Sequence, residues 1–183
     1  MDQINQRHSE ALASLSKPPN YTAFYRGIET VNWMIHYPWV FSSAEIQADV
    51  DNYYFSTRRD IFQYVALDIF SQDKRSLKGY LVLSISRKKS KTVVKILDAH
   101  FSDPEDHRTA AVLSLQYAAR HLADRIDIPG EFATYFKSRA LLARLLKKQT
   151  RLFMFSPKSE NSPLARSKGR IVLNYCDGDT AFT

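Results

Sequence analysis

An aspartate and a histidine stand two residues apart in a segment with the composition of a β-strand. Asp98 and His100 belong to the run KTVVKILDAHF over residues 91–101. Because residues two apart share a face of a strand, we expect the carboxylate to be able to orient the imidazole. An imidazole, with an ordinary pKa of about 6.5, suits proton transfer at neutral pH. Both residues are candidate catalytic groups, and the alternative is a strand end whose polar groups are simply hydrogen-bonded.

Strict alternation along this run assigns its residues to two faces. Asp98 and His100 would share their face with Val94 and Ile96. Both faces are largely apolar, which favours a sheet covered on each side. The opposite face would carry the other residues from position 93 onward, namely Val93, Lys95, Leu97, Ala99 and Phe101.

Positive charge is unevenly distributed along the chain. The formal net charge is +7, from 26 Lys and Arg against 19 Asp and Glu. Residues 137–170 hold ten basic residues and one acidic residue, Glu160, and residues 87–91 read RKKSK. A concentrated basic surface attracts nucleic acid, anionic lipid or a phosphorylated small molecule. A solvated helix face followed by a polar loop would have the same composition.

Composition excludes several classes of protein. With 183 residues, 44% of them hydrophobic, the chain can bury the core of one domain, which excludes an intrinsically disordered tail. One cysteine, Cys176, and five histidines without a His-x3-His pair argue against a metal or redox mechanism. We find no apolar run long enough for a membrane span or a signal peptide, and therefore expect a soluble, cytoplasmic protein.

Three strands are expected to form an antiparallel meander. Residues 60–70, 77–86 and 91–101 are rich in β-branched and aromatic residues. Polar segments at 71–76 and 87–90 join them as turns. The meander therefore predicts a mostly antiparallel sheet at the centre of the domain.

The residues before the meander predict helices. We expect residues 1–21 to form a peripheral helix and linker, and residues 22–183 to form the domain. From Thr22 to Ile35, apolar residues recur with the spacing of an amphipathic helix, which Pro38 ends. The capping box of Ser42 and Glu45 predicts a second helix.

The clearest helix start follows the meander. Residues 102–106 read SDPED, a capping residue, a proline in the first turn and acids that complement the helix dipole. The helix should end near Arg125 and bury the stripe Ala111, Leu115, Ala118 and Leu122. Beyond it, the sequence predicts strands at 131–136, 151–156 and 170–176, a helix at 138–148 and a polar loop at 157–169.

This order of elements resembles the fold of GNAT-type acyl-CoA N-acyltransferases over about residues 22–182. Asn32-Trp33 followed by His36-Tyr37-Pro38 is similar to a helix of GNAT-like proteins found with polysaccharide synthesis. The ending DGDTAF at 177–182 is similar to their terminal segment. The resemblance implies a single α/β (α+β) domain with a mixed, mostly antiparallel sheet flanked by helices. The usual first strand of that fold has no clear counterpart before Thr22.

The resemblance also implies an activity and a site. It implies a divergent acyl-CoA-dependent N-acyltransferase that uses acetyl-CoA or another acyl-CoA and a small acceptor, an amino sugar or related metabolite. GNAT enzymes bind the coenzyme pyrophosphate at the helix after the meander, in a loop reading Gln/Arg-x-x-Gly-x-Gly/Ala. Asp98 and His100 fall where these enzymes often place substrate or base residues. The positions that match the loop and would bind the cofactor are His107, Arg108, Thr109 and Ala110.

The sequence departs from the family pattern at two places. The loop contains no glycine, and the acids at 103, 105 and 106 would repel a pyrophosphate. The tyrosine that commonly protonates the thiolate is replaced by Ala143, and Tyr117, Tyr135 or Tyr175 could substitute for it. Two alternatives therefore stay open: a GNAT-fold interaction or regulatory module without coenzyme A binding, and a basic module that binds nucleic acid or another anion.

Overall fold

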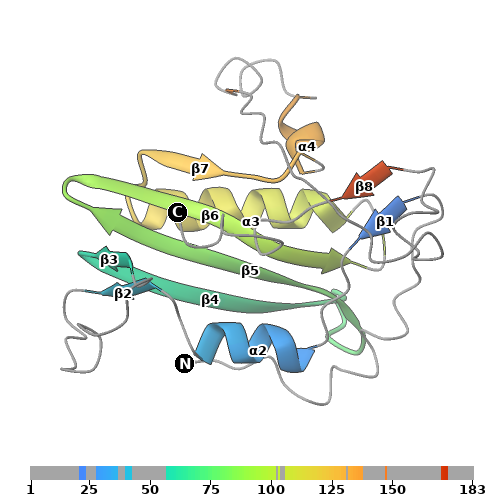
Figure 1. Cartoon of the computed structure of the whole chain (residues 1–183). Coiled ribbons are helices and arrows are strands. Elements are labelled where there is room, and N and C mark those ends of the chain that lie inside the picture. Colours follow the sequence, from blue (N-terminus) through green and yellow to red (C-terminus); the bar gives the residue numbers. More distant parts are fainter. Residues whose placement is uncertain are drawn as a thin grey trace, which may run out of the picture.

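The protein has a mixed α+β fold, and a four-stranded mixed sheet is its largest element (Figure 1). The strands lie in the order β4-β5-β6-β7, and only the last pair is parallel. Figure 1 shows α3 running along β6, and α2 beside β4. The computed structural model describes residues 21–23, 28–36, 40–42, 57–101, 103, 106–130, 132–137, 147 and 170–172.

The antiparallel meander is confirmed. The strands β4 (Ile61–Phe70), β5 (Leu77–Lys88) and β6 (Lys91–Phe101) lie within two residues of the expected ranges. The turn between β5 and β6 contains Lys89, whose φ of 55° is a left-handed conformation suited to a tight hairpin. Alternating apolar residues and polar turns are local signals, which explains why the sequence predicted these strands well.

An irregularity in β6 changes which residues share a face. Val82 pairs with Asp98, whereas Leu83 pairs with Ile96, so Leu97 is an extra residue in β6. A bulge of this kind reverses the alternation beyond it. The expectation of strict alternation is therefore wrong from Leu97 onward. One face carries Val93, Lys95, Asp98 and His100, and the other carries Val94, Ile96, Ala99 and Phe101.

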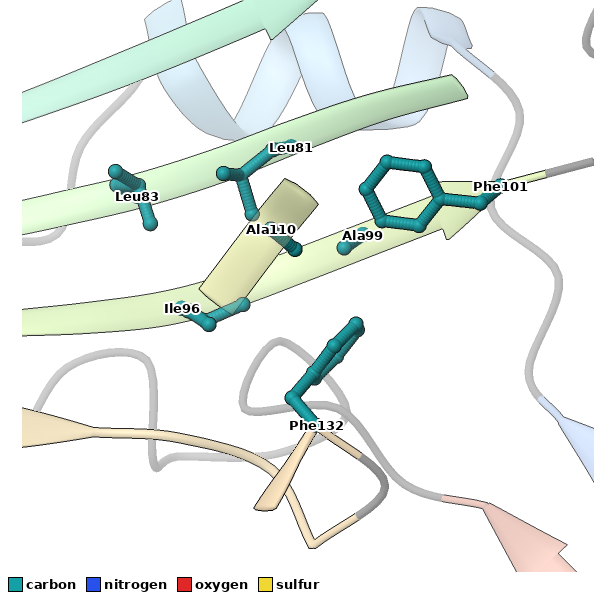
Figure 2. Packing of buried hydrophobic residues seen from close by; sticks show 7 residues of the cluster. All are labelled: Leu81, Leu83, Ile96, Ala99, Phe101, Ala110 and Phe132. Carbon is teal, nitrogen blue, oxygen red and sulfur yellow. The ribbon is translucent and has the colours of Figure 1, made fainter. Parts of the chain in front are cut away.

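The core lies between α3 (His107–Arg120) and the sheet face that carries Ala99 and Phe101 (Figure 2). The buried residues of the helix are small, namely Ala110, Ala111, Ser114 and Ala118. Small side chains let the helix backbone approach the sheet, so that larger strand residues can fill the interface. The central cluster consists of Leu81, Leu83, Ile96, Ala99, Phe101, Ala110 and Phe132.

Helix α3 ends at Arg120, five residues before the expected Arg125. Leu122 has a φ of 49°, and the amide of Ala123 donates to the Ala118 carbonyl at 2.8 Å. This is the geometry of a Schellman cap, which usually places glycine where Leu122 stands, so no glycine marks the end of this helix. The predicted burial of Leu122 is wrong, because this side chain is 87% exposed. Of the rest of the stripe, Ala111 and Ala118 are buried and Leu115 is partly buried.

The strand β7 (Arg125–Asp127) was not expected from the sequence. It pairs in parallel with Val93–Lys95 at the beginning of β6, after the crossover through α3. Asp124 holds the junction, since its amide donates to the Thr92 carbonyl at 2.9 Å and its carboxylate accepts from the Thr92 amide at 2.8 Å. A strand of three residues is too short to show a period in the sequence.

Two further expectations are wrong. Residues 131–136 were predicted as a strand, but Ala133–Lys137 form the helix α4, and buried Phe132 and Phe136 have helical spacing. The first amphipathic helix, α2, spans Ile28–His36 and does not begin at Thr22. Thr22 belongs instead to β1 (Tyr21–Ala23), which pairs in parallel with β8 (Arg170–Val172).

A second small sheet joins β2 (Val40–Ser42) to β3 (Thr57–Arg59) in parallel. Ser42 thus ends a strand, and the helix predicted from its capping box lies outside the described residues. In the part of the chain that the structure describes, we find no helix with the length and apolar composition of a membrane span. The other predictions outside the described residues concern 1–20, 138–148 apart from Lys147, 151–156, 157–169, 173–176 and the ending at 177–182.

The close approach of β5 and β6 requires glycine at position 79. A Cβ added to Gly79 would meet the His100 carbonyl oxygen, and would lie 2.9 Å from Cα of Phe101. Backbone atoms cannot rotate away, so we expect Gly79→Ala to lower the free energy of unfolding by about 1–3 kcal/mol, as overpacking does. Gly130→Ala is the matched control, because a Cβ there meets no atom within 4 Å. Equal urea unfolding midpoints for the two variants would contradict this account of the strand pairing.

Candidate functional site

The predicted site residues gather where β6 ends and α3 begins. Asp98 and His100 lie among the last four residues of β6, and His107 is the first residue of α3. The charge of His107 acts on His100, so the two imidazoles are electrostatic neighbours. The structure therefore places the two groups of residues that the sequence indicated at the same end of the sheet, with Asp98 and His100 on the face opposite to the one that α3 covers.

Asp98 has a tyrosine partner inside the protein. Only 4% of Asp98 is exposed, and its Oδ2 accepts a hydrogen bond from the Tyr80 hydroxyl at 3.1 Å. Tyr80 is the register partner of His100 on β5, and the two rings stack with their centres 6.3 Å apart. Tyr80, Asp98 and His100 thus form one cluster. The sequence analysis missed Tyr80, because finding it requires the register between β5 and β6.

Burial disfavours the charged form of both histidines of the site. Burial lowers the pKa of His100 below its ordinary value of 6.5, and the charge of His107 lowers it further. Burial also lowers the pKa of His107, an effect that Asp106 and Asp103 oppose. A neutral imidazole can accept a proton at pH 7. His100 is therefore suited to act as a general base.

The first turn of α3 offers backbone amides and one exposed cation. Asp106 is the N-cap residue and makes no side-chain cap hydrogen bond. The first amides of a helix have no partner within it and can bind an anion. Arg108 is exposed, and its guanidinium lies 5.8 Å from the ring centre of Tyr135. Thr109 is partly buried and Ala110 fully buried, so Ala110 can offer a ligand only its backbone.

A phenylalanine fills the space between β6 and α3. Phe132 is fully buried against the cluster that includes Phe101 and Ala110. Its ring centre lies 4.9 Å from that of His107, and Figure 2 shows the ring beside the edge of β6. The pairing of β7 with β6 ends at Lys95, and beyond it Phe132 packs in the cluster that contains Ala99 and Phe101 of β6.

Comparisons with known proteins were made for the whole chain. No family model, curated protein or solved structure matches it. Within the described ranges, no three His, Cys, Asp or Glu side chains come together as a metal site.

The other residues singled out in the sequence lie on the helices α2 and α3 or outside the described residues. Asn32, Trp33 and His36 are on α2, where the Trp33 side chain is 52% exposed and does not serve as a buried anchor of the helix. Tyr117 lies on α3 and stacks with His121, with ring centres 6.3 Å apart. Ala143 and Tyr175 lie outside the described residues.

Proposed function

We propose that the protein is a divergent acyl-CoA-dependent N-acyltransferase of the GNAT type. The observation that supports it most is the topology: an antiparallel meander, the crossover helix α3, and a parallel strand β7 that pairs with β6 over only three residues. β6 continues to Phe101 beyond this pairing, toward the end of the sheet where α3 begins. An amino sugar or a related amine is proposed as the acceptor from the resemblance alone.

The amides of the first turn of α3 would hold the coenzyme phosphates, together with the guanidinium of Arg108. Helix amides and the helix dipole favour an anion at this position. Asp103 and Asp106 add negative charge nearby and oppose binding. We therefore expect a weaker phosphate site than a glycine-containing loop would provide.

His100 would accept the proton of the acceptor ammonium, so that the nitrogen lone pair can attack the thioester carbonyl. The C–N bond then forms, the C–S bond breaks, and the sulfur leaves with the electron pair. The leaving thiolate needs a proton, and we propose the Tyr80 hydroxyl as the acid, because its ring stacks on that of His100. The bulge at Leu97 interrupts the ladder in this part of β6 and could leave a backbone amide to polarise the carbonyl.

Two observations favour a second candidate, a GNAT-fold interaction or regulatory module that does not bind coenzyme A. Phe132 fills the space beside β6, and the acids near α3 disfavour a pyrophosphate. The two candidates differ in a simple property, because only the enzyme must bind the coenzyme.

Thermal unfolding with and without millimolar acetyl-CoA separates the two candidates. A ligand at 100 times its dissociation constant stabilises the folded state by about 2.7 kcal/mol. We expect such a stabilisation for the wild type and a smaller one for Arg108→Glu, which places negative charge beside the proposed phosphate site. An unchanged melting temperature of the wild type at millimolar acetyl-CoA would contradict the enzyme and support the non-catalytic module.

A further inference from the structure

A basic pocket lies at the end of the sheet opposite to the His100 cluster. It has a volume of about 440 Å³ and lies at the hairpin that joins β5 to β6. Lys95 is the lining residue of β6 closest in sequence to the cluster, three residues before Asp98 and five before His100, or roughly 15 Å from His100 at the usual rise per residue. The pocket therefore lies at the hairpin end of the sheet face that carries the cluster, and His100 lies near the other end of that face.

The register of the sheet explains how the pocket forms. Phe62, Ser86, Val93 and Arg125 are successive partners across four strands, so their side chains share one face. Ser84 and Lys95 form the next row on the same face. The small sheet of β2 and β3 contributes Val40 and Arg59 to the lining. The pocket thus combines a floor of strand residues with walls from the hairpin and the small sheet.

The lining is strongly positive. Among the described residues that line the pocket, half are Lys or Arg and none is acidic. Lys95 is only 7% exposed and Ser84 only 3%, so both belong to the floor. Arg125 is partly neutralised by Asp127, with Nε 2.8 Å from Oδ1. A concave site with low-dielectric walls strengthens the field of such charges on an anion. The basic residues of the lining are Arg59, Lys88, Lys89, Lys91, Lys95 and Arg125.

The hairpin keeps like charges opposite one another. Lys88 pairs directly with Lys91 across the ladder, and Arg87 and Lys89 adjoin them. Like charges in a directly opposed pair destabilise a hairpin. A local arrangement that costs stability without an evident structural gain is expected at functional sites. The charge of this hairpin is therefore better explained by a bound anion than by folding.

We propose that this pocket binds a small anion that carries two or more phosphate groups. Lys and Arg are the side chains that bind phosphate most strongly in proteins. The volume lies within the range of about 300–1,000 Å³ that is usual for small-molecule sites. The side chain of Phe62 adds an apolar surface to the wall. The proposal does not depend on acyl transfer, because it uses the other end of the sheet.

The test is calorimetric titration of the full chain with inorganic tripolyphosphate. We expect binding of one ion per chain, with an affinity that falls as salt is added. Lys91→Glu should weaken binding about tenfold or more, as the loss of a charge-assisted hydrogen bond does. The same substitution should leave the melting temperature unchanged or raise it, because it replaces a like-charge pair by a pair of opposite charges.

Arg75→Glu is the matched control. It makes the same change of net charge at an exposed residue between β4 and β5, away from the pocket, and should keep the affinity of the wild type. Equal weakening by Arg75→Glu and Lys91→Glu would mean that only net charge matters, and would overturn the proposal. The absence of tripolyphosphate binding at millimolar concentration would overturn it as well.

A single-stranded oligonucleotide is the third arm of the test. If it binds and tripolyphosphate neither binds nor competes, the hairpin is a nucleic-acid surface and the small-ligand proposal is wrong. Arg108→Glu separates this proposal from the proposed function. It should weaken the effect of acetyl-CoA on thermal stability and leave tripolyphosphate binding unchanged, so each proposal can fail without the other.

Discussion

His100→Ala is expected to lower kcat for transfer from acetyl-CoA to an amine by about 10²–10⁴-fold, the usual contribution of a general base. His100 is partly buried beside Tyr80, and its burial lowers its pKa. The measurement is the release of free thiol with the best acceptor from a panel of amino sugars and related amines. His121→Ala serves as control, because His121 lies at the other end of α3 and should not affect kcat.

The pH dependence gives the same prediction a second readout. Because the pKa of His100 is lowered, the wild-type rate should be constant above about pH 6.5 and fall as pH drops through that lowered pKa. His100→Ala should lose this dependence. An unchanged kcat, or an acidic limb that persists in the variant, would contradict a role of His100 as the base. The failure of every amine in the panel would contradict the proposed enzyme.

The free energy of unfolding should also fall at low pH, as the catalytic rate does, so it must be measured separately. Burial of His100 and His107 disfavours their charged forms, so the folded protein binds fewer protons than the unfolded chain. The free energy of unfolding is therefore fully retained above about pH 6.5 and declines as pH falls through the lowered pKa values. Circular dichroism at each pH distinguishes a lost base from a lost fold.

Phe132→Ala is expected to lower the free energy of unfolding by about 3–5 kcal/mol, the usual cost of removing a buried phenylalanine. Phe132 is fully buried. It directly precedes α4 and packs with Ala110 and His107 of α3 and with Phe101 at the end of β6. A domain has only about 5–15 kcal/mol of stability, so this variant should lose a large part of it. Urea unfolding followed by circular dichroism measures the change.

Leu122→Ala is the control for this prediction. Leu122 is 87% exposed, so its truncation should change stability by no more than about 0.5 kcal/mol. If Phe132→Ala proves too unstable to purify, Phe132→Leu keeps most of the volume and should cost less than Phe132→Ala. A Phe132→Ala variant as stable as Leu122→Ala would contradict the packing described between β6 and α3.

The comparison of sequence and structure shows which signals are local. The bounds of the meander strands were predicted within two residues, because alternating apolar residues and turn residues occur within each segment itself. The bulge at Leu97 was missed, because it depends on the register with β5. The end of α3 was missed because Leu122 adopts the left-handed conformation without glycine. Each error concerns a feature that partner strands or backbone geometry decide.

The candidate site was predicted in part for the same reason. Asp98 and His100 share a face because they are two residues apart and both follow the bulge, so their spacing was enough. Tyr80 could not be found from spacing, since it enters the cluster through cross-strand pairing. The basic pocket combines residues from six strands, and only its hairpin, residues 87–91, was visible in the sequence.

Amide hydrogen exchange with and without acetyl-CoA tests the proposed coenzyme site most directly. We predict slower exchange in the first turn of α3, residues 107–110, and in the last residues of β6. Coenzyme A carries phosphates that could also enter the basic pocket, so the position of the effect matters more than its presence. Slower exchange confined to the hairpin of β5 and β6, or no change anywhere, would contradict coenzyme binding at α3.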